Sequence, residues 1–311
     1  MEEFLVRSND ISMHGQNPGS RPVEELLKNG IIILDKWAGP TTHDVSAAVK
    51  KLFSLEKAGS SGTLDPAVTG VLPITLENAC KTIPALQHLD KEYVGIMHLH
   101  KDVDDLELKN AVNSFVGKIR QRPPVKSAVA RRERERTVHS MTIIERDGRN
   151  VLFKIRCEAG TYVRVVCHQI GTKVGGAHMK ELRRTEVGRF SEKDCVRIQD
   201  VADAYYEWKE SGSEEIRNYV LPVEAAVEHL KKIIIKDSAV FSVASGSPVY
   251  STGISKASKG IVQDELVAVL TLKGELAAIA RANMASEEMM KKKGLAAKTD
   301  RVIIDKRLYQ I

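Results

Sequence analysis

One carboxylate, Asp65, stands among glycines and small hydroxyl residues in the stretch GSSGTLDPAVTGVLP, residues 59–73. Gly62 and Gly70 can adopt backbone conformations closed to other residues, and Pro66 pushes Asp65 toward an extended conformation. This composition is typical of a turn in which the aspartate bonds nearby amides. If the loop is functional instead, a single displayed carboxylate suits covalent nucleophilic catalysis better than glycoside hydrolysis, which needs a second acid.

Two further residues have a structural and a functional interpretation. Arg164 falls about three residues after Thr161, the expected N-cap of a helix. A cation there opposes the helix dipole, so Arg164 is either solvent-exposed or held by an anion such as a phosphate or a buried carboxylate. Tyr93 opens an alternating strand, where it is either a half-buried aromatic or a stacking surface for a base.

Basic residues gather in three places. Residues 118–136 hold eight lysines and arginines against two glutamates, and Pro123 and Pro124 stiffen the entry to the segment. A solvated loop is the ordinary explanation, but the arginine fork favours phosphate. Arg183-Arg184 and the run of lysines at 291–293 are the other two places.

The length and composition of the chain limit the classes of protein to which it can belong. The chain of 311 residues is longer than one usual domain. Its net charge of +6 and pI near 9.0 fit either a solvated basic surface or a polyanionic partner such as nucleic acid. The four cysteines form no CxxC pair and no zinc-finger spacing, which predicts reduced thiols and no metal site. No apolar run is long enough for a membrane span.

Hydrophobic periodicity predicts the elements that position these residues. Residues 30–36 form a short β-branched run that predicts a buried strand, and Thr41 or Thr42 is the expected N-cap of the helix that follows. Residues 92–103 alternate as a strand, and residues 105–117 predict an amphipathic helix. Residues 151–157 alternate before a helical period that begins after Thr161.

These elements predict an α+β protein with a central mixed, mainly antiparallel sheet flanked by helices. Residues 206–232 are expected to be helical and polar. The later residues have short strands and Gly/Ser turns, which predict a small β-rich domain. The predicted organisation is therefore an N-terminal extension over 1–22, a larger α+β domain over 23–232 and a small β-rich domain over 233–311, which the resemblance described below implies to be a catalytic and an RNA-binding domain.

Six stretches together resemble a known family. They are GIIILDKWAGPTTHDV, KAGSSGTLDPAVTGVLPITLENACKTI, KEYVGIMHLH, RPPVKSAV, EAGTYVRVVCHQIG and GAHMKELRRTEVG. Their order and spacing are similar to those of the TruB-type RNA pseudouridine synthases, and most similar to the dyskerin-like branch with its archaeal members. The resemblance runs from about residue 22 to the C-terminus, and the last segment resembles a PUA domain.

The resemblance implies roles for particular residues. Asp65 matches the family nucleophile, which acts on a uridine flipped out of the RNA. Tyr93 matches a tyrosine that stacks on the flipped base and takes part in proton removal. Arg164 matches the arginine that pairs with the nucleophile and would keep it ionised. Lys36 matches a motif around the pocket, and Leu182 matches an apolar pocket wall.

The resemblance also implies contacts to RNA. The segment 122–136 corresponds to a family loop that closes over substrate RNA, with Arg122, Lys126, Arg131 and Arg132 as expected binding residues. Neither a cofactor nor a metal is implied. Ser60 stands where the family often has histidine, and Trp37 where it often has proline. These departures put a histidine–RNA contact in doubt and leave the setting of the nucleophile intact.

Three functions remain open at this point. The first is the catalytic subunit of a guide-RNA-directed H/ACA-type particle that modifies rRNA and also acts on tRNA. Its partners would be an H/ACA guide RNA and small partner proteins. The second is a stand-alone synthase for the T-loop uridine of tRNA, and the third is a non-catalytic RNA-binding scaffold. Because Asp65, Tyr93 and Arg164 are all present, the resemblance favours an enzyme. The absence of long lysine-rich tails indicates a cytoplasmic, prokaryotic protein.

Overall fold

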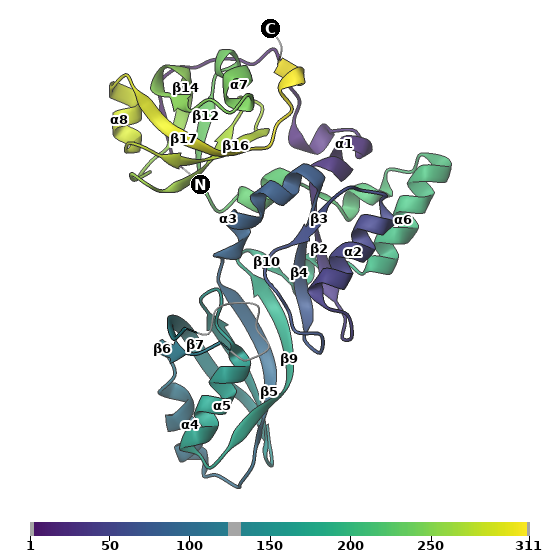
Figure 1. Cartoon of the computed structure of the whole chain (residues 1–311), viewed down its shortest axis with the longest axis vertical. Helices are drawn as coiled ribbons and strands as arrows, with labels where there is room; N and C mark the ends of the chain where they lie inside the picture. The colour runs from purple at the N-terminus through teal and green to yellow at the C-terminus, as the bar shows by residue number, and fades with distance from the viewer. Residues whose placement is uncertain (1–2, 124–131, 310–311) are drawn as a thin grey trace.

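The computed structural model of the chain describes residues 3–123 and 132–309. The described residues form two β-sheets with helices packed on them. In Figure 1 the C-terminal sheet makes the upper lobe, and the larger sheet extends through the middle and lower lobes. The architecture is the α+β arrangement expected from the sequence.

The larger sheet is mixed and mainly antiparallel. Its strand order is β11-β2-β4-β9-β5-β8-β7-β6, with β3 paired to β4 and β10 to β9, and β4 runs parallel to β9. The bounds of its strands are β2 Gly30–Lys36, β3 Ala58–Ser60, β4 Thr69–Leu76, β5 Lys91–Leu99, β6 Gly117–Gln121, β7 Arg134–Asp147, β8 Asn150–Cys157, β9 Ala177–Val187, β10 Phe190–Ser191 and β11 Leu221–Pro222.

The apolar run of β2 is buried at the centre of the middle lobe, with a core on each face of the strand. Ile32 and Leu34 face a core shared with α2 (Thr42–Leu52) and α6 (Ile198–Ser211), whereas Ile31 and Ile33 face Leu86 and neighbouring residues on the other side. A strand that is covered on both faces reads as a continuous apolar run, as this one does. The helices that complete this lobe are α1 (Val23–Lys28) and α3 (Ile83–Gln87).

The lower lobe packs α4 (Asp105–Asn113) and α5 (Val163–Lys173) against β5 and β8. The expected helix over 105–117 is wrong at its end. It stops at Asn113, and Gly117, which has φ +106, begins β6. The chain changes from helix to strand before Gly117, whose backbone conformation only glycine adopts without strain.

The C-terminal sheet includes a strand from the N-terminus. Its order is β1-β14-β12-β15-β16-β17-β13, and β1 pairs with β14 so that Phe4 lies opposite Ser258. Helices α7 (Asp237–Ala244) and α8 (Ser286–Lys291) accompany it. The strand bounds are β1 Phe4–Val6, β12 Lys231–Ile235, β13 Val249–Tyr250, β14 Ile254–Ser258, β15 Leu266–Leu270, β16 Leu276–Ala282 and β17 Leu295–Val302.

A shared core and a polar hub join the two sheets. Ala79, Val223 and Val227 pack with Leu276 and Ile279 of the C-terminal sheet. The carboxylate of Glu224 accepts two hydrogen bonds of 2.8 Å from Arg21 and one of 2.7 Å from the backbone amide of Leu276. The junction is therefore packed and hydrogen-bonded.

The expectation of a long helical stretch over 206–232 is wrong. Helix α6 ends at Ser211 because Gly212 takes the left-handed conformation of a C-cap. The chain then makes 3₁₀ turns around the short strand β11 before β12 begins at Lys231. Across the described parts of the chain, no helix is long and apolar enough to cross a membrane.

Candidate functional site

The loop that carries Asp65 is held from two sides. The buried ammonium of Lys36, at the end of β2, donates to the backbone carbonyls of Trp37, Pro66 and Val68 at 2.9–3.1 Å. Its Nζ also lies 3.5 Å from the Asp65 carbonyl. These hydrogen bonds of Lys36 therefore hold the backbone of the loop.

The start of α2 grips the same loop. The Thr42 hydroxyl accepts from the Leu64 amide at 2.9 Å and donates to the Leu64 carbonyl at 3.1 Å. Thr41 is the N-cap, because its side chain accepts from the Asp44 amide and forms a capping box with that residue. Of the two N-caps that the sequence allowed, Thr41 has the cap and Thr42 has the contact to the loop.

Asp65 and Arg164 meet in space. Their carboxylate and guanidinium lie 3.1 Å apart, and both side chains are 49% exposed. Arg164 is the second residue of α5, so a cation does occupy the first helical turn, and an anion partners it. The expected N-cap is wrong by one residue: Tyr162 takes that position, while Thr161 donates its hydroxyl to the Glu158 carbonyl at 2.8 Å.

Tyr93 and Leu182 lie on the neighbouring strands β5 and β9. Tyr93 is 8% exposed and pairs in register with Arg184, and Leu182 lies opposite Gly95. A Cβ on Gly95 would lie 2.7 Å from the Leu182 side chain, so the glycine makes room for it. Burial raises the pKa of the Tyr93 phenol, the Asp65 charge raises it further, and Arg184 opposes both.

Buried positive charge surrounds this site. Lys36, Lys91 and Arg184 are all at most 5% exposed. Burial lowers the pKa of all three, and the charge of Arg184 lowers the pKa of Lys36 further and takes part in lowering that of Lys91 to about 8. The Lys91 ammonium donates to the carbonyls of Gln87 and Leu89. The positive charges of Lys36, Lys91 and Arg184 favour the negatively charged form of groups in the site.

The expected RNA-binding loop is only partly described. Lys126 and Arg131 lie outside the described residues, and Arg122 and Arg132 are exposed. Arg122 follows Gln121, whose side chain bonds both the amide and the carbonyl of Tyr162 at 3.0–3.1 Å. This contact places the entry of the basic segment beside the N-terminus of α5. Residues 134–136, expected as loop, belong to strand β7.

Lys91 and Arg184 are the residues that sequence reasoning missed. In the sequence Arg183-Arg184 stood out only as a place where basic residues gather, and the structure turns the two residues to opposite sides. Arg183 pairs with Asp35 at 2.9 Å and with Glu192, whereas Arg184 is buried. The strand alternation of residues 177–187 was the signal that could have separated them.

The arrangement can present one exposed carboxylate, paired with an arginine, beside an aromatic hydroxyl. A carboxylate of this kind is suited to nucleophilic attack. In the described residues no group of three or more histidine, cysteine, aspartate or glutamate side chains could hold a metal ion. A groove lined by Leu108, Val112 and Met141 lies between α4 and β7, and neither Asp65 nor Arg164 lines it.

Family models match almost the whole chain. The N-terminal domain of TruB family pseudouridylate synthase matches residues 50–163, and the C-terminal domain of tRNA pseudouridylate synthase B matches 164–228. The PUA domain matches residues 231–303, and the DKCLD domain matches 1–46.

Curated relatives are similar over nearly their full length. A probable tRNA pseudouridine synthase B of Methanocaldococcus jannaschii is 48% identical over 99% of this chain and 93% of its own. The protein of the same description from Pyrococcus horikoshii is 49% identical over 99% and 94%.

Solved structures agree with the sequence comparison. A chain of a Cbf5-Nop10-Gar1 complex superposes with a TM-score of 0.93 at 46% identity, covering 99% of this chain and 96% of its own. A chain of an H/ACA RNP bound to a substrate RNA containing 2′-deoxyuridine gives a TM-score of 0.92 at 44% identity with the same coverage. The chain therefore belongs to the TruB family of pseudouridylate synthases, in the form that carries a DKCLD segment and a PUA domain.

Proposed function

We propose that the protein converts uridine to pseudouridine in rRNA as the catalytic subunit of a guide-RNA-directed H/ACA-type particle, and that it also acts on tRNA. The ion pair of Asp65 and Arg164 is the observation that carries the catalytic part of this proposal. The particle is supported by the similarity to chains of a Cbf5-Nop10-Gar1 complex and of an H/ACA RNP with substrate RNA.

In the proposed reaction Asp65 is the nucleophile. Its carboxylate forms a covalent bond either to C1′ of the ribose or to the uracil base, and the N1–C1′ bond breaks. The uracil then rotates, C5 bonds to C1′, and the bond to Asp65 breaks, which restores the free carboxylate. C5 loses its proton and N1 gains one, so the product is an isomer of the substrate. Tyr93 stacks on the base and takes part in removing the C5 proton. Arg164 holds the Asp65 carboxylate in place before attack.

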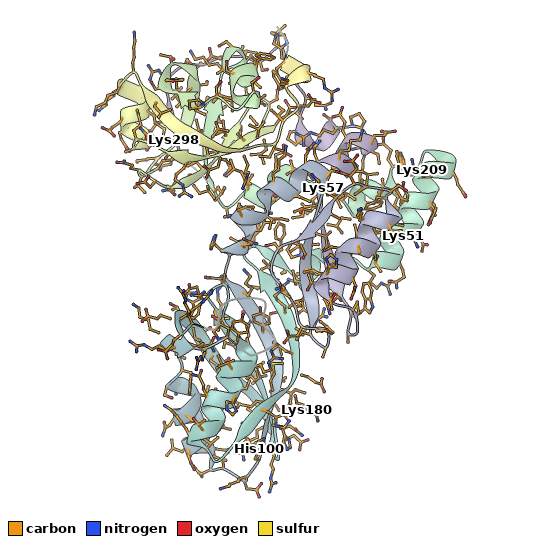
Figure 2. All side chains as sticks on the ribbon, in the orientation of Figure 1. Lys51, Lys57, His100, Lys180, Lys209 and Lys298 are labelled. Carbon is orange, nitrogen blue, oxygen red and sulfur yellow. The ribbon has the colours of Figure 1, made fainter. Side chains whose placement is uncertain are left out.

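Other residues bind RNA or shape the site in this proposal. Leu182 forms an apolar wall, Lys36 fixes the backbone of the Asp65 loop, and Arg122, Lys126, Arg131 and Arg132 contact RNA phosphates. The C-terminal domain would hold the end of the guide RNA. The exposed Lys298 on β17, visible in Figure 2, and the exposed lysines 291–293 support a polyanion on that domain.

The domain limits proposed here are an extension over 1–22, a catalytic domain over 23–232 and a PUA domain over 233–311. We also propose that the protein acts in the cytoplasm. Its four cysteines are free, which fits a reducing compartment.

A stand-alone tRNA synthase is the second candidate, because the curated relatives are described as probable tRNA pseudouridine synthases. One assay separates the two. Pseudouridine is counted in an rRNA fragment with guide RNA and partner proteins, and in bare tRNA with the protein alone. The particle proposal expects rRNA modification that depends on the guide. If bare tRNA is fully modified, and guide RNA and partner proteins do not increase pseudouridine in the rRNA fragment, the stand-alone function is the correct one.

A further inference from the structure

Arg184 is a buried arginine that none of the roles above uses. It is 1% exposed, and its Nε donates to the Val71 carbonyl at 2.7 Å. Its backbone is also fixed, because a Cβ on Gly70 would lie 2.1 Å from the Arg184 carbonyl oxygen. Gly70 has φ +103, so both its missing side chain and its conformation suit this close approach.

The guanidinium has a hydrogen bond at Nε but, within the described parts of the chain, lacks one at Nη2. Nη2 of Arg184 is buried and has no hydrogen-bond partner among the described residues. A buried donor without a partner costs free energy, so a group that persists there calls for a functional explanation. Arg184 is the register partner of Tyr93, so the two residues lie side by side on β9 and β5.

The chemistry of the two side chains fixes the direction of their interaction. Arginine has five N–H donors and no acceptor. In a hydrogen bond between these two register partners, the phenol oxygen can therefore only accept. The hydrogen of the phenol stays available for a ligand, because it cannot be given to the arginine.

Three charged or titratable groups affect the pKa of the Tyr93 phenol. They are Arg184 on β9, Cys157 on β8 and Asp65 in the loop before β4. Arg184 is the one cation among these three, and it opposes the effects of burial and of the Asp65 charge on the phenol. Removing its charge should therefore make the phenol harder to ionise.

We propose that Arg184 is a positioning residue for Tyr93. Its guanidinium holds the phenol oxygen as an acceptor and leaves the phenol hydrogen directed to the substrate base. The inference rests on the proposed function of Tyr93 beside Asp65. It adds a residue that acts through Tyr93 and does not touch the reacting atoms.

The test is a double-mutant cycle on the full chain with its RNA and partner proteins. Arg184→Gln, Tyr93→Phe and the double variant are compared in single-turnover pseudouridine formation at saturating RNA. Arg184→Gln should slow the reaction by about tenfold or more, as expected for loss of one charge-assisted hydrogen bond. RNA affinity should be unchanged, and the double variant should be no slower than Tyr93→Phe. If the two single substitutions slow the reaction independently, so that their rate losses multiply in the double variant, the proposal is wrong.

A spectroscopic readout separates positioning from a merely structural role. Tyrosines are labelled with ¹³C at Cζ, and the Tyr93 signal is assigned by its loss in Tyr93→Phe. In Arg184→Gln this signal should titrate at higher pH than in the wild type, and an unchanged titration would contradict the proposal. Arg183→Gln is the matched control, because the neighbouring Arg183 faces Asp35 and Glu192, and it should change neither readout.

Arg184→Lys guards against misfolding of the glutamine variant. Lysine keeps the charge but has a shorter, single-point donor, so its loss of rate should fall between wild type and glutamine and should vanish in the Tyr93→Phe background. If Arg184→Lys still slows the reaction in the Tyr93→Phe background, the proposal is wrong. If the wild type forms no pseudouridine on any RNA, the proposed function fails, whereas the Tyr93 titration still reports on Arg184.

Discussion

Asp65 and Arg164 form an ion pair although about a hundred residues separate them in the chain. The Asp65 loop joins β3 to β4, whereas Arg164 begins α5 after β8, and the two charged groups lie 3.1 Å apart. Both side chains are half exposed, so the pair contributes little to stability in water. An exposed pair whose cation lies in the first turn of a helix, where the helix dipole disfavours it, is better explained by chemistry than by folding.

Replacement of Arg164 by methionine should therefore separate activity from stability. A hydrogen bond to a charged group is worth about 1.5–3 kcal/mol, so the single-turnover rate should fall about 10- to 150-fold. The free energy of unfolding should change by less than about 1 kcal/mol. Single-turnover kinetics and denaturant titration measure the two quantities.

Arg156→Met is the matched control for this variant. Arg156 forms an ion pair of 3.2 Å with Glu186 at similar exposure, but on the strands and away from Asp65. Its loss should leave the rate within about twofold, as expected for a surface pair. Equal rate losses in the two variants would show that the Asp65–Arg164 pair has no special role.

Lys91 should give folding stability a pH dependence in the alkaline range. Its pKa is lowered from 10.5 to about 8 in the folded chain, so between these values the unfolded chain holds more protons. Stability then rises with pH across this window, by at most about 1.4 kcal/mol per pH unit from this one group. Below about pH 8 the full cost of burying the ammonium is present.

The difference in unfolding free energy between wild type and Lys91→Met isolates this effect. The wild type should gain relative to the variant as pH rises from 8 to 10. Lys57→Met, at an exposed lysine, should follow the wild type in parallel. A difference between wild type and Lys91→Met that stays constant with pH would contradict the lowered pKa.

Lys36→Met should destabilise the loop that carries Asp65. The substitution leaves the carbonyls of Trp37, Pro66 and Val68 without their donor. Unpaired buried groups cost about 1–3 kcal/mol each, and solvent entry offsets part of this, so we expect a net loss of about 3 kcal/mol. Amide hydrogen exchange at residues 65–70 should accelerate.

Lys51→Met on the exposed face of α2 is the control and should leave both stability and exchange unchanged. Fast exchange at 65–70 already in the wild type would show that Lys36 does not hold the loop.

Glu224→Ala should loosen the junction of the two sheets. The carboxylate joins Arg21 to the Leu276 amide, and its loss leaves a buried arginine without its partner. A broken buried pair costs about 3–5 kcal/mol. Calorimetry should show one transition splitting into two. Glu214→Ala removes an exposed pair with Arg217 and should keep the wild-type profile. A single unshifted transition in Glu224→Ala would mean that the apolar contacts hold the junction without this hub.

The sequence predicted elements where local patterning decides the structure. The β2 run, the strand at 150–157 and the cation in the first turn of α5 were all readable from residue types. The errors lie where one residue sets a boundary, as at Gly212, which ends α6, or at Tyr162, which replaces Thr161 as the N-cap. Propensity places such boundaries only within a few residues.

Residue types singled out Asp65, Tyr93 and Arg164 one by one, and only the family resemblance implied that Arg164 pairs with Asp65, as it does. That contact depends on strand order, because the loop before β4 and the helix after β8 meet only through the pairing of β4, β9, β5 and β8. The burial of Arg184 was hidden for the same reason. Its neighbour Arg183 is just as basic, and only the sheet decides which of the two faces inward.

The direct test of the central claim is the amount of pseudouridine formed by Asp65→Asn. The substitution keeps the size of the side chain and removes the nucleophilic charge, so RNA affinity should be unchanged. Asp203→Asn on the exposed face of α6 serves as the control. Chromatography of the nucleosides released from the target site, which separates the two isomers, should find full conversion with wild type and Asp203→Asn, and none with Asp65→Asn after many wild-type turnover times. Pseudouridine formed by Asp65→Asn at a wild-type rate would contradict the assignment of Asp65 as the nucleophile.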